Sequence, residues 1–199
     1  SNVAWIQMLD KQFSSPPKEG TYILTIGSIG YDTITTPDGH SEDTLGGSAT
    51  YFSIAASYFT QVSVVAVVGT DFAIKDRAYF HQLGIDDSGI ETAPGKTFKW
   101  AAEYAHDFST RRTLSTQLNV FGSFHPTLTD KHKSPTHLFL GNMEPQLQLT
   151  VLDQVNPRPH LVAADTMNFW IEGHRKALDQ VVNQVDILFV DEGEARQYS

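Results

Sequence analysis

The segment YILTIGSIGYD, residues 22–32, decides the fold that the sequence predicts. Residues 22–26 are apolar or β-branched without alternation, a pattern typical of a strand buried on both faces of a sheet. Glycines follow directly, and ligands of open α/β sheets bind at the carboxyl ends of strands. Asp32 is therefore expected to accept hydrogen bonds from the hydroxyl groups of a substrate. On this segment alone, a glycine turn followed by a solvated Asp is the simpler interpretation. The Gly-x-Gly-x-x-Gly spacing of dinucleotide-binding loops is missing.

Four more apolar runs follow along the chain, and helical patterns lie between most of them. Strands that alternate with helices of about ten residues or more indicate βαβ units and a largely parallel sheet. We therefore predict an α/β fold with a mostly parallel sheet flanked by helices. The further strands are expected at 62–68, 136–140, 160–164 and 186–190, and the helices at 48–59, 72–83, 145–155 and 173–185.

Two regions interrupt this alternation. Residues 34–44 are polar and rich in turn formers, and residues 96–108 and 111–121 have the pattern of two strands joined by a turn at Ser109 and Thr110. We predict a small β-sheet that projects from the parallel core, with strands from about 33–45 and 96–121. Such a sheet often covers a ligand site as a lid. An ordinary edge hairpin explains the pattern equally well.

Composition narrows the class of protein. The 199 residues carry 14 Lys and Arg against 23 Asp and Glu, a net charge of −9, and include no Cys. This length is typical of one domain, and without Cys there is no disulfide and no thiolate metal site. The acidity argues against a broad nucleic-acid surface, and the longest apolar run, 64–68, is too short to span a membrane. We expect a soluble, cytoplasmic protein with neither nucleic acid nor membrane as a partner.

A glycine pair precedes the first predicted helix, in the order Gly46, Gly47, Ser48. Glycines at a helix N-terminus present backbone N–H groups and the positive end of the helix dipole to a polar ligand. A plain loop-to-helix joint explains the pair equally well, with Ser48 as the N-cap.

The end of the chain predicts an unfinished element. The segment DEGEAR, residues 191–196, follows the last predicted strand and has the acidic residues of a helix start. No end of that helix is visible before Ser199, and a sheet that stopped there would have an open edge. We expect residues 1–199 to form a single, incomplete α/β domain.

Taken in order, the motifs resemble those of the PfkB, or ribokinase-like, family of sugar and nucleoside kinases. The resemblance covers nearly the whole chain. It rests on GSIGYD at 27–32, GGSAT at 46–50, VVGTDF at 67–72, LGID at 83–86 and DEGEA at 191–195. It implies a Rossmann-like core with a β lid, and transfer of the γ-phosphoryl group of ATP to a substrate hydroxyl.

The resemblance also implies roles for particular residues. Asp32, Gly46 and Gly47 would bind substrate hydroxyls, and Glu144, in the segment GNMEP at 141–145, falls near a further substrate-contacting position. Aromatic lid residues would stack on a base or cover a sugar face; these are Phe98 and Trp100.

Asp191 and Glu194 resemble the Asn-x-x-Glu motif that organises Mg²⁺ and the phosphates of ATP, largely through ordered water and without a direct metal ligand. Mg²⁺ favours one or two carboxylates plus waters, which agrees with this pair. Favourable acids at a helix N-terminus are the simpler explanation of the two residues alone.

Three residues depart from the family pattern: Gly30 and Tyr51 stand where Asn is usual, and Asp191 replaces another Asn. The first two changes argue against ribose and suggest a different or bulkier acceptor, which Tyr51 would contact. Asp191 adds a negative charge near the expected triphosphate unless a cation or proton offsets it.

The Gly-Ala-Gly-Asp element, which holds the catalytic Asp of the family, does not occur in the sequence. We expect that Asp, and the nucleotide-binding part of the protein, to lie beyond Ser199. A general base contributes about 10²- to 10⁴-fold to the rate, so this chain alone is expected to be inactive.

The function expected from the sequence is the N-terminal, substrate-binding part of an ATP- and Mg²⁺-dependent sugar kinase that forms a homodimer through the lid strands. One alternative is a nucleoside kinase of the same family. Another is a non-catalytic sugar-binding or regulatory protein, should the chain end at Ser199. The eight His residues contain no His-x-x-x-His pair, so no metal cluster is expected.

Overall fold

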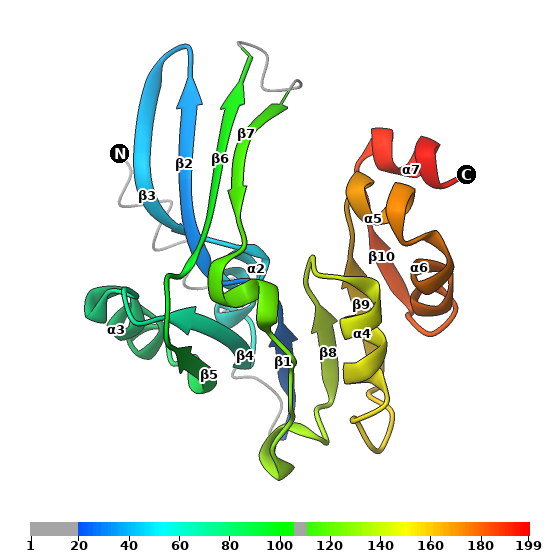
Figure 1. Cartoon of the computed structure of the whole chain (residues 1–199). Coiled ribbons are helices and arrows are strands. Elements are labelled where there is room, and N and C mark those ends of the chain that lie inside the picture. Colours follow the sequence, from blue (N-terminus) through cyan, green and yellow to red (C-terminus); the bar gives the residue numbers. More distant parts are fainter. Residues whose placement is uncertain (1–19, 106–110) are drawn as a thin grey trace, which may run out of the picture.

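The computed structural model describes residues 20–105 and 111–199, and these form two sheets. A six-stranded sheet with the order β10-β9-β8-β1-β4-β5 forms the core, and every pair of neighbours in it is parallel. A four-stranded sheet with the order β3-β2-β6-β7, which we call the lid sheet, rises from the core in Figure 1. The predicted α/β class and the small second sheet are both confirmed.

The core strands follow the predicted apolar runs closely. One strand was missed, because it is an edge strand whose sequence, DDSGIETA, contains one large apolar residue, Ile90. The strands are β1 Tyr22–Ile26, β4 Gln61–Gly69, β5 Asp86–Ala93 (the one missed), β8 His137–Leu140, β9 Leu161–Asp165 and β10 Ile187–Phe189.

Helices cover both faces of the core sheet, because alternate residues of its strands face opposite sides. In β4, Val64 and Val68 pack with Phe80 of α3, whereas Val65 and Val67 belong to the cluster that contains Leu149 of α4. A short helix, α5, was not predicted, and α6 is shorter than the predicted 173–185. The helices are α2 Ser48–Ser57, α3 Ile74–Gln82, α4 Pro145–Leu152, α5 Asn168–Gly173, α6 Arg175–Val182 and α7 Glu192–Tyr198.

The lid sheet consists of two antiparallel hairpins, β2–β3 and β6–β7, joined by parallel pairing of β2 with β6. Its strands are β2 Gly30–Thr36, β3 Gly39–Gly46, β6 Phe98–Tyr104 and β7 Arg111–Gln117. The polar, turn-rich segment is thus a hairpin. Its first strand begins at residue 30, so Asp32 lies within a strand and not in a loop.

The predicted strand 111–121 is wrong at its end. The strand stops at Gln117, and Asn119–Ser123 forms a 3₁₀ helix, η1. Asn119, the first residue of η1, has a φ of 49°. A positive φ does not occur in a regular strand, which explains the stop. A second 3₁₀ helix, η2 Asp130–His132, lies farther along this connection. The predicted turn at Ser109 and Thr110 lies outside the described residues.

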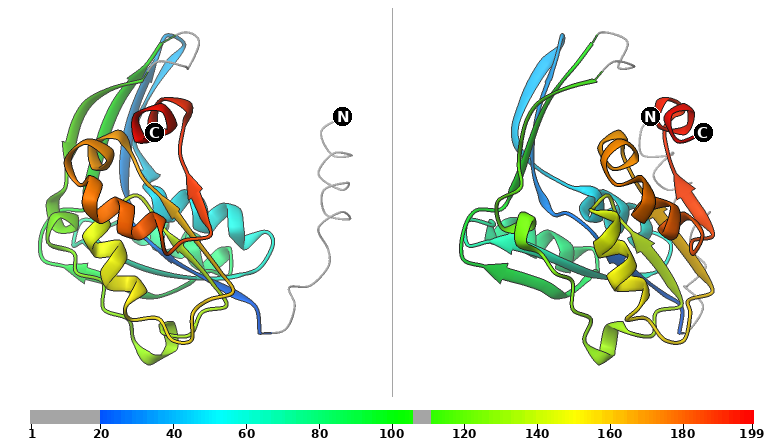
Figure 2. Two further views of the ribbon diagram at one scale, coloured as in Figure 1. Left: turned by 90° about the vertical axis from the view of Figure 1, so that its right-hand side faces the viewer. Right: turned by 45° about the vertical axis from the view of Figure 1, so that its right-hand side comes forward.

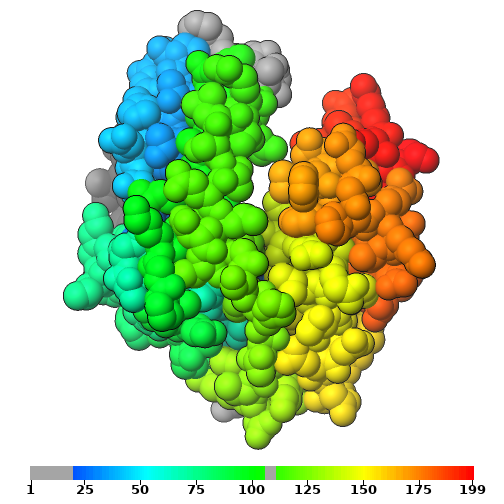
Figure 3. Space-filling view, viewed as in Figure 1, coloured from blue at the N-terminus to red at the C-terminus, as the bar shows by residue number. Residues whose placement is uncertain are grey.

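An open groove borders the lid sheet. Figure 3 shows the groove between the lid sheet and the part of the molecule that contains α5, and Figure 2 shows the lid sheet curving upward from the core. The carboxyl ends of β1 and β8 point toward this side of the molecule (Figure 1). Among the helices of the described residues, none is long and apolar enough to cross a membrane.

Candidate substrate site at the base of the lid sheet

Asp32 is a buried carboxylate in β2, with 5% of its surface exposed. Its Oδ2 accepts a hydrogen bond of 3.1 Å from the Tyr51 hydroxyl, and the backbone N–H of Gly47 is a second donor. Burial raises the pKa of Asp32 above its ordinary value, although both hydrogen bonds act in the opposite direction. The group is therefore a hydrogen-bond acceptor held in place by two protein donors.

The glycine pair is required by close packing around this carboxylate. A Cβ on Gly46 would overlap the carboxyl group of Asp32. Gly47 has a φ of 98°, and a Cβ there would overlap the backbone of Ser28. Only glycine adopts this conformation and leaves this space without strain. Both glycines therefore have a structural reason, and their predicted contact with substrate stays a prediction.

The N-cap of α2 is Gly47, which has no side chain that could form a capping hydrogen bond. The prediction that Ser48 is the N-cap was therefore wrong. Ser48 is instead the first residue of the helix and contacts Ser28, two residues after β1. Its N–H donates to Ser28 Oγ at 3.0 Å, and its own Oγ accepts from Ser28 N–H at 3.4 Å. This exchange fixes the start of α2 beside Asp32.

The aromatic residues predicted to contact substrate lie on the same face of the lid sheet as Asp32. Asp32 pairs with Trp100 and Gly30 pairs with Phe98 across the β2–β6 ladder, and residues paired in this way point to the same side. A Cβ on Gly30 would overlap both the ring and the backbone carbonyl of Phe98. The departure at residue 30 therefore accommodates an aromatic ring at the base of this face.

Glu144 lies elsewhere in the fold, at the N-cap of α4 after β8. Its Oε1 is 3.7 Å from Nδ1 of His174, and the Trp170 indole N–H donates to Asn142 Oδ1 at 2.8 Å. These contacts join α5 to the loop after β8. No hydrogen bond or ion pair among the described residues links Glu144 to Asp32.

Asp191 and Glu194 form a capping box at the start of α7. Asp191 Oδ1 accepts from Glu194 N–H at 2.8 Å, and Glu194 Oε2 accepts from Asp191 N–H at 2.9 Å. The predicted helix start is confirmed, and local capping accounts for one oxygen of each carboxylate. The other oxygens are not used in the box, so the predicted role toward Mg²⁺ and phosphate stays a prediction.

Sequence reasoning missed Asp165, the last residue of β9. Burial raises its pKa to about 6, and the negative charge of Glu194 adds to the shift. Asp165 therefore lies near Glu194 of α7, at the carboxyl end of the sheet. Asp165 directly follows the predicted strand 160–164, so its position at the carboxyl end of a strand is a signal that could have found it.

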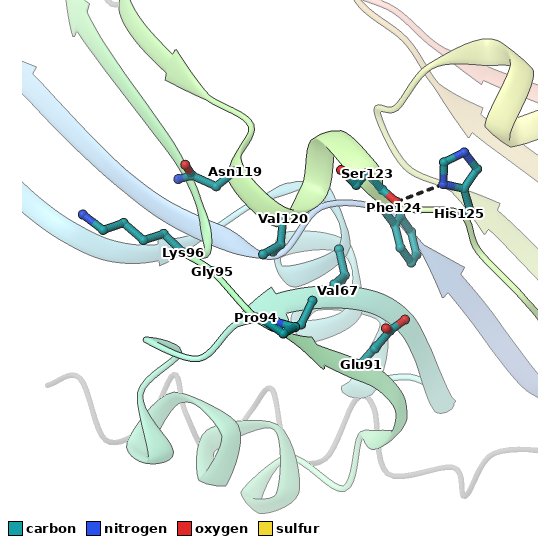
Figure 4. Close-up of a pocket in the computed structure, with 11 residues that line it drawn as sticks. Val67, Glu91, Pro94, Gly95, Lys96, Asn119, Val120, Ser123, Phe124 and His125 are labelled. Carbon is teal, nitrogen blue, oxygen red and sulfur yellow. Dashed lines mark hydrogen bonds between the residues drawn. The ribbon is translucent and has the colours of Figure 1, made fainter.

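Two cavities lie outside this group. One, of about 380 Å³, lies at the base of the lid sheet, and Figure 4 shows Val67, Pro94 and Glu91 on one side of it, with Val120 and Phe124 on the other. A second of similar volume lies beside α3 and includes Arg77 and His81. None of the predicted substrate residues lines either cavity. Within residues 20–105 and 111–199, no group of three or more His and acidic side chains is placed to hold a metal ion.

Comparison with known proteins finds similar proteins, although no protein-family model matches the chain. The sequence is 25% identical over 177 residues to a cytidine kinase of Thermococcus kodakarensis, covering 87% of this chain and 62% of that protein. A nucleoside kinase of Methanocaldococcus jannaschii, described as an archaeal member of the ribokinase family, superimposes with a TM-score of 0.70 at 16% identity, covering 89% of this chain and 63% of that one.

A putative ribokinase II of E. coli, solved in complex with ATP and Mg²⁺, superimposes with a TM-score of 0.68 at 17% identity. The match covers 90% of this chain and 65% of that one. The chain thus spans less than two thirds of the length of these proteins. The family resemblance of the motifs is confirmed at the level of structure: the chain has the ribokinase-like fold.

Proposed function

We propose that this chain is the substrate-binding part of a ribokinase-family kinase that transfers the γ-phosphoryl group of ATP to a hydroxyl of a nucleoside in the cytoplasm. The observation that carries the proposal is the buried Asp32 carboxylate, held between the glycine pair and Tyr51 on the aromatic face of the lid sheet. A carboxylate fixed by protein donors accepts hydrogen bonds from sugar hydroxyls, and fixed positioning is the main source of catalysis in phosphoryl transfer.

The aromatic face supports a nucleoside over the free sugar that the sequence favoured. Phe98 and Trp100 lie on the face of Asp32, and such rings stack on bases, which have π-faces of their own. The 25% identical relative is a cytidine kinase, and a structural neighbour is a nucleoside kinase. A free sugar would use Asp32 in the same way but would need only one ring over its face.

The two carboxylates at the start of α7 suit a Mg²⁺–ATP complex held through water. Mg²⁺ favours one or two carboxylates with its remaining positions filled by water, and Asp191 and Glu194 each keep one oxygen outside the capping box. Burial raises the pKa of Asp165, the negative charge of Glu194 adds to that rise, and a bound cation would offset the repulsion between the two carboxylates. When bound, Mg²⁺ neutralises charge that develops on the phosphates.

In this proposal the residues of the chain bind and orient the acceptor. Asp32 holds a sugar hydroxyl, the glycine pair admits the substrate close to the backbone, and the lid sheet excludes water from the reacting groups. No general base is assigned among residues 1–199, which contain no Gly-x-Gly-Asp segment.

The test compares Asp32→Asn with Asp38→Asn in the complete protein. Asp38 is exposed in the β2–β3 turn, so its change serves as the matched control. ADP formation from Mg²⁺–ATP is measured with a panel of nucleosides and free sugars. We expect a nucleoside to support turnover in the unaltered protein and in Asp38→Asn, and turnover to fall at least tenfold in Asp32→Asn. Turnover with free sugars only would contradict the nucleoside assignment, and turnover that is insensitive to Asp32→Asn would remove Asp32 from the site.

A further inference from the structure

Tyr51 covers the carboxylate that the proposed function assigns to the acceptor. It lies in the first turn of α2, and 53% of its surface is exposed, whereas Asp32 is 5% exposed. Its hydroxyl donates to Asp32 Oδ2 at 3.1 Å. Because the buried partner of this hydrogen bond is Asp32 and the exposed partner is Tyr51, the phenol lies between the carboxylate and the solvent.

The other sides of the Asp32 carboxylate are closed by backbone. Gly46 packs against it so closely that a Cβ would overlap the carboxyl group, and the N–H of Gly47 donates to it. In the ladder, Asp32 has Thr44 of β3 on one side and Trp100 of β6 on the other. A substrate hydroxyl therefore approaches Asp32 on the side that Tyr51 occupies.

The hydroxyl of Tyr51 is a permanent donor at neutral pH. Burial raises the pKa of Tyr51 to about 12, and the charge of Asp32 acts in the same direction. A carboxylate has two oxygens, and Tyr51 donates to Oδ2 on the side from which a substrate approaches. A substrate that donates two neighbouring hydroxyls, one to each oxygen, must displace the phenol from Oδ2, whereas a substrate that presents one hydroxyl binds Oδ1 beside it.

We propose that Tyr51 determines the sugar specificity of the site: its hydroxyl takes the position at Asp32 that one hydroxyl of a vicinal diol would take, so that the protein prefers a 2′-deoxynucleoside to the ribonucleoside. The inference rests on the proposed function and names its substrate class. It also gives a chemical reason for the Tyr at residue 51, where Asn is usual in the family. A substrate without the second hydroxyl lacks one donor to Asp32, and the Tyr51 hydroxyl supplies that donor.

The experiment measures how the complete protein discriminates within two matched pairs, 2′-deoxycytidine against cytidine and 2-deoxyribose against ribose. Dissociation constants are measured by calorimetry, and kcat/KM is measured with Mg²⁺–ATP. In the pair that it binds, we expect the unaltered protein to favour the deoxy member by about tenfold. The ribo member would displace the Tyr51 hydroxyl from Asp32 and leave it unpaired, and a site rejects a substrate that leaves one of its hydrogen-bonding groups unpaired.

Tyr51→Phe keeps the ring and removes the hydroxyl, which frees one position on Asp32. We expect the preference to move toward the ribo member by about tenfold, mainly through KM and the dissociation constant. Tyr51→Asn, which also shortens the side chain, should move it in the same direction. Tyr58→Phe is the matched control, because Tyr58 is a 64% exposed tyrosine at the C-cap of the same helix. It should leave the ratio unchanged.

The outcomes separate this inference from the proposed function. A ratio that is the same in Tyr51→Phe, Tyr51→Asn and the unaltered protein would overturn the specificity role while leaving a nucleoside kinase in place. A preference of the unaltered protein for the ribo member would do the same. Failure of the unaltered protein to act on any nucleoside of the panel described above, or on its 2′-deoxy counterpart, would refute the proposed function and this inference with it. Thermal unfolding of each variant shows whether a change in ratio comes from a folded protein.

Discussion

The Cα of Gly46 lies so close to the carboxyl group of Asp32 that a Cβ at residue 46 would overlap it. The two residues come from neighbouring strands of the lid sheet, in which Gly46 pairs with Gly30 and Thr44 pairs with Asp32. The contact is therefore a property of strand register as well as of residue type. It explains why a glycine next to a helix start is tied to a carboxylate 14 positions earlier in the chain.

Gly46→Ala is expected to weaken substrate binding and to destabilise the fold. The added methyl group has no space unless the Asp32 carboxylate moves, and overpacking of this kind costs about 1–3 kcal/mol. Urea unfolding measures the stability, and calorimetry with a bound nucleoside measures the affinity. Gly39→Ala is the control, because no atom lies within 4 Å of its Cβ position. Equal effects of the two variants would contradict the close approach described above.

Much of this fold is predictable from local sequence, and the exceptions have physical causes. The strands β1, β4, β8 and β9 are short, continuous apolar runs, which is the signal that a strand covered on both faces leaves in a sequence. The edge strand β5 is covered less and carries polar residues, so the same signal is absent.

The candidate site divides in the same way. Asp32 stands out in the sequence because it comes after a predicted strand, and the glycine pair stands out because it precedes a predicted helix. The hydrogen bond from Tyr51 to Asp32 joins residues 19 positions apart, and the effect of Glu194 on Asp165 joins residues from different strand ends. Contacts of this kind depend on tertiary packing, which no local pattern encodes.

Asp165→Asn is expected to stabilise the protein near pH 8 and to have little effect near pH 4. Burial raises the pKa of Asp165 to about 6 in the folded state, above the value of about 3.9 in an unfolded chain. The folded state therefore binds the proton more tightly, and stability falls as the pH rises from about 4 to 6. At one pKa unit per 1.36 kcal/mol, the ionised group costs about 2–3 kcal/mol above pH 6.

Urea unfolding of the unaltered protein and of Asp165→Asn at pH 4 and pH 8 measures this effect. Asp153→Asn is the control, because Asp153 is an exposed acid at the C-cap of α4. A stability difference between the two Asp165 forms that is the same at both pH values would contradict the buried, proton-linked carboxyl group.

The lid sheet is expected to form a homodimer interface. All seven residues of β7 are exposed, Leu114 among them at 50%, and β7 is an edge strand of the sheet. Exposed strand edges with apolar residues pair readily with another chain. Leu114→Lys should shift the complete protein toward monomer in light scattering, whereas Ile74→Lys, at an 89% exposed position on α3, should not. A protein that is monomeric at every concentration would contradict this interface.

Glu194→Gln is expected to raise the Mg²⁺ requirement and lower kcat while leaving nucleoside affinity nearly unchanged. Gln keeps the side-chain oxygen that accepts from Asp191 N–H, so the capping box and α7 are retained, and only the charge is lost. That charge is the one felt by Asp165, which makes it the α7 carboxylate placed near the strand ends. Asp32 and its partners belong to the lid sheet and α2, so the acceptor contacts are separate from Glu194.

The measurement is kcat against free Mg²⁺ in the complete protein, with nucleoside binding followed by calorimetry. Glu192→Gln is the matched control, since Glu192 is an exposed acid of the same helix turn that pairs with Arg196. If Glu194→Gln abolished nucleoside binding and left the Mg²⁺ dependence unchanged, the carboxylate would belong to the acceptor site and not to the phosphate end of the groove.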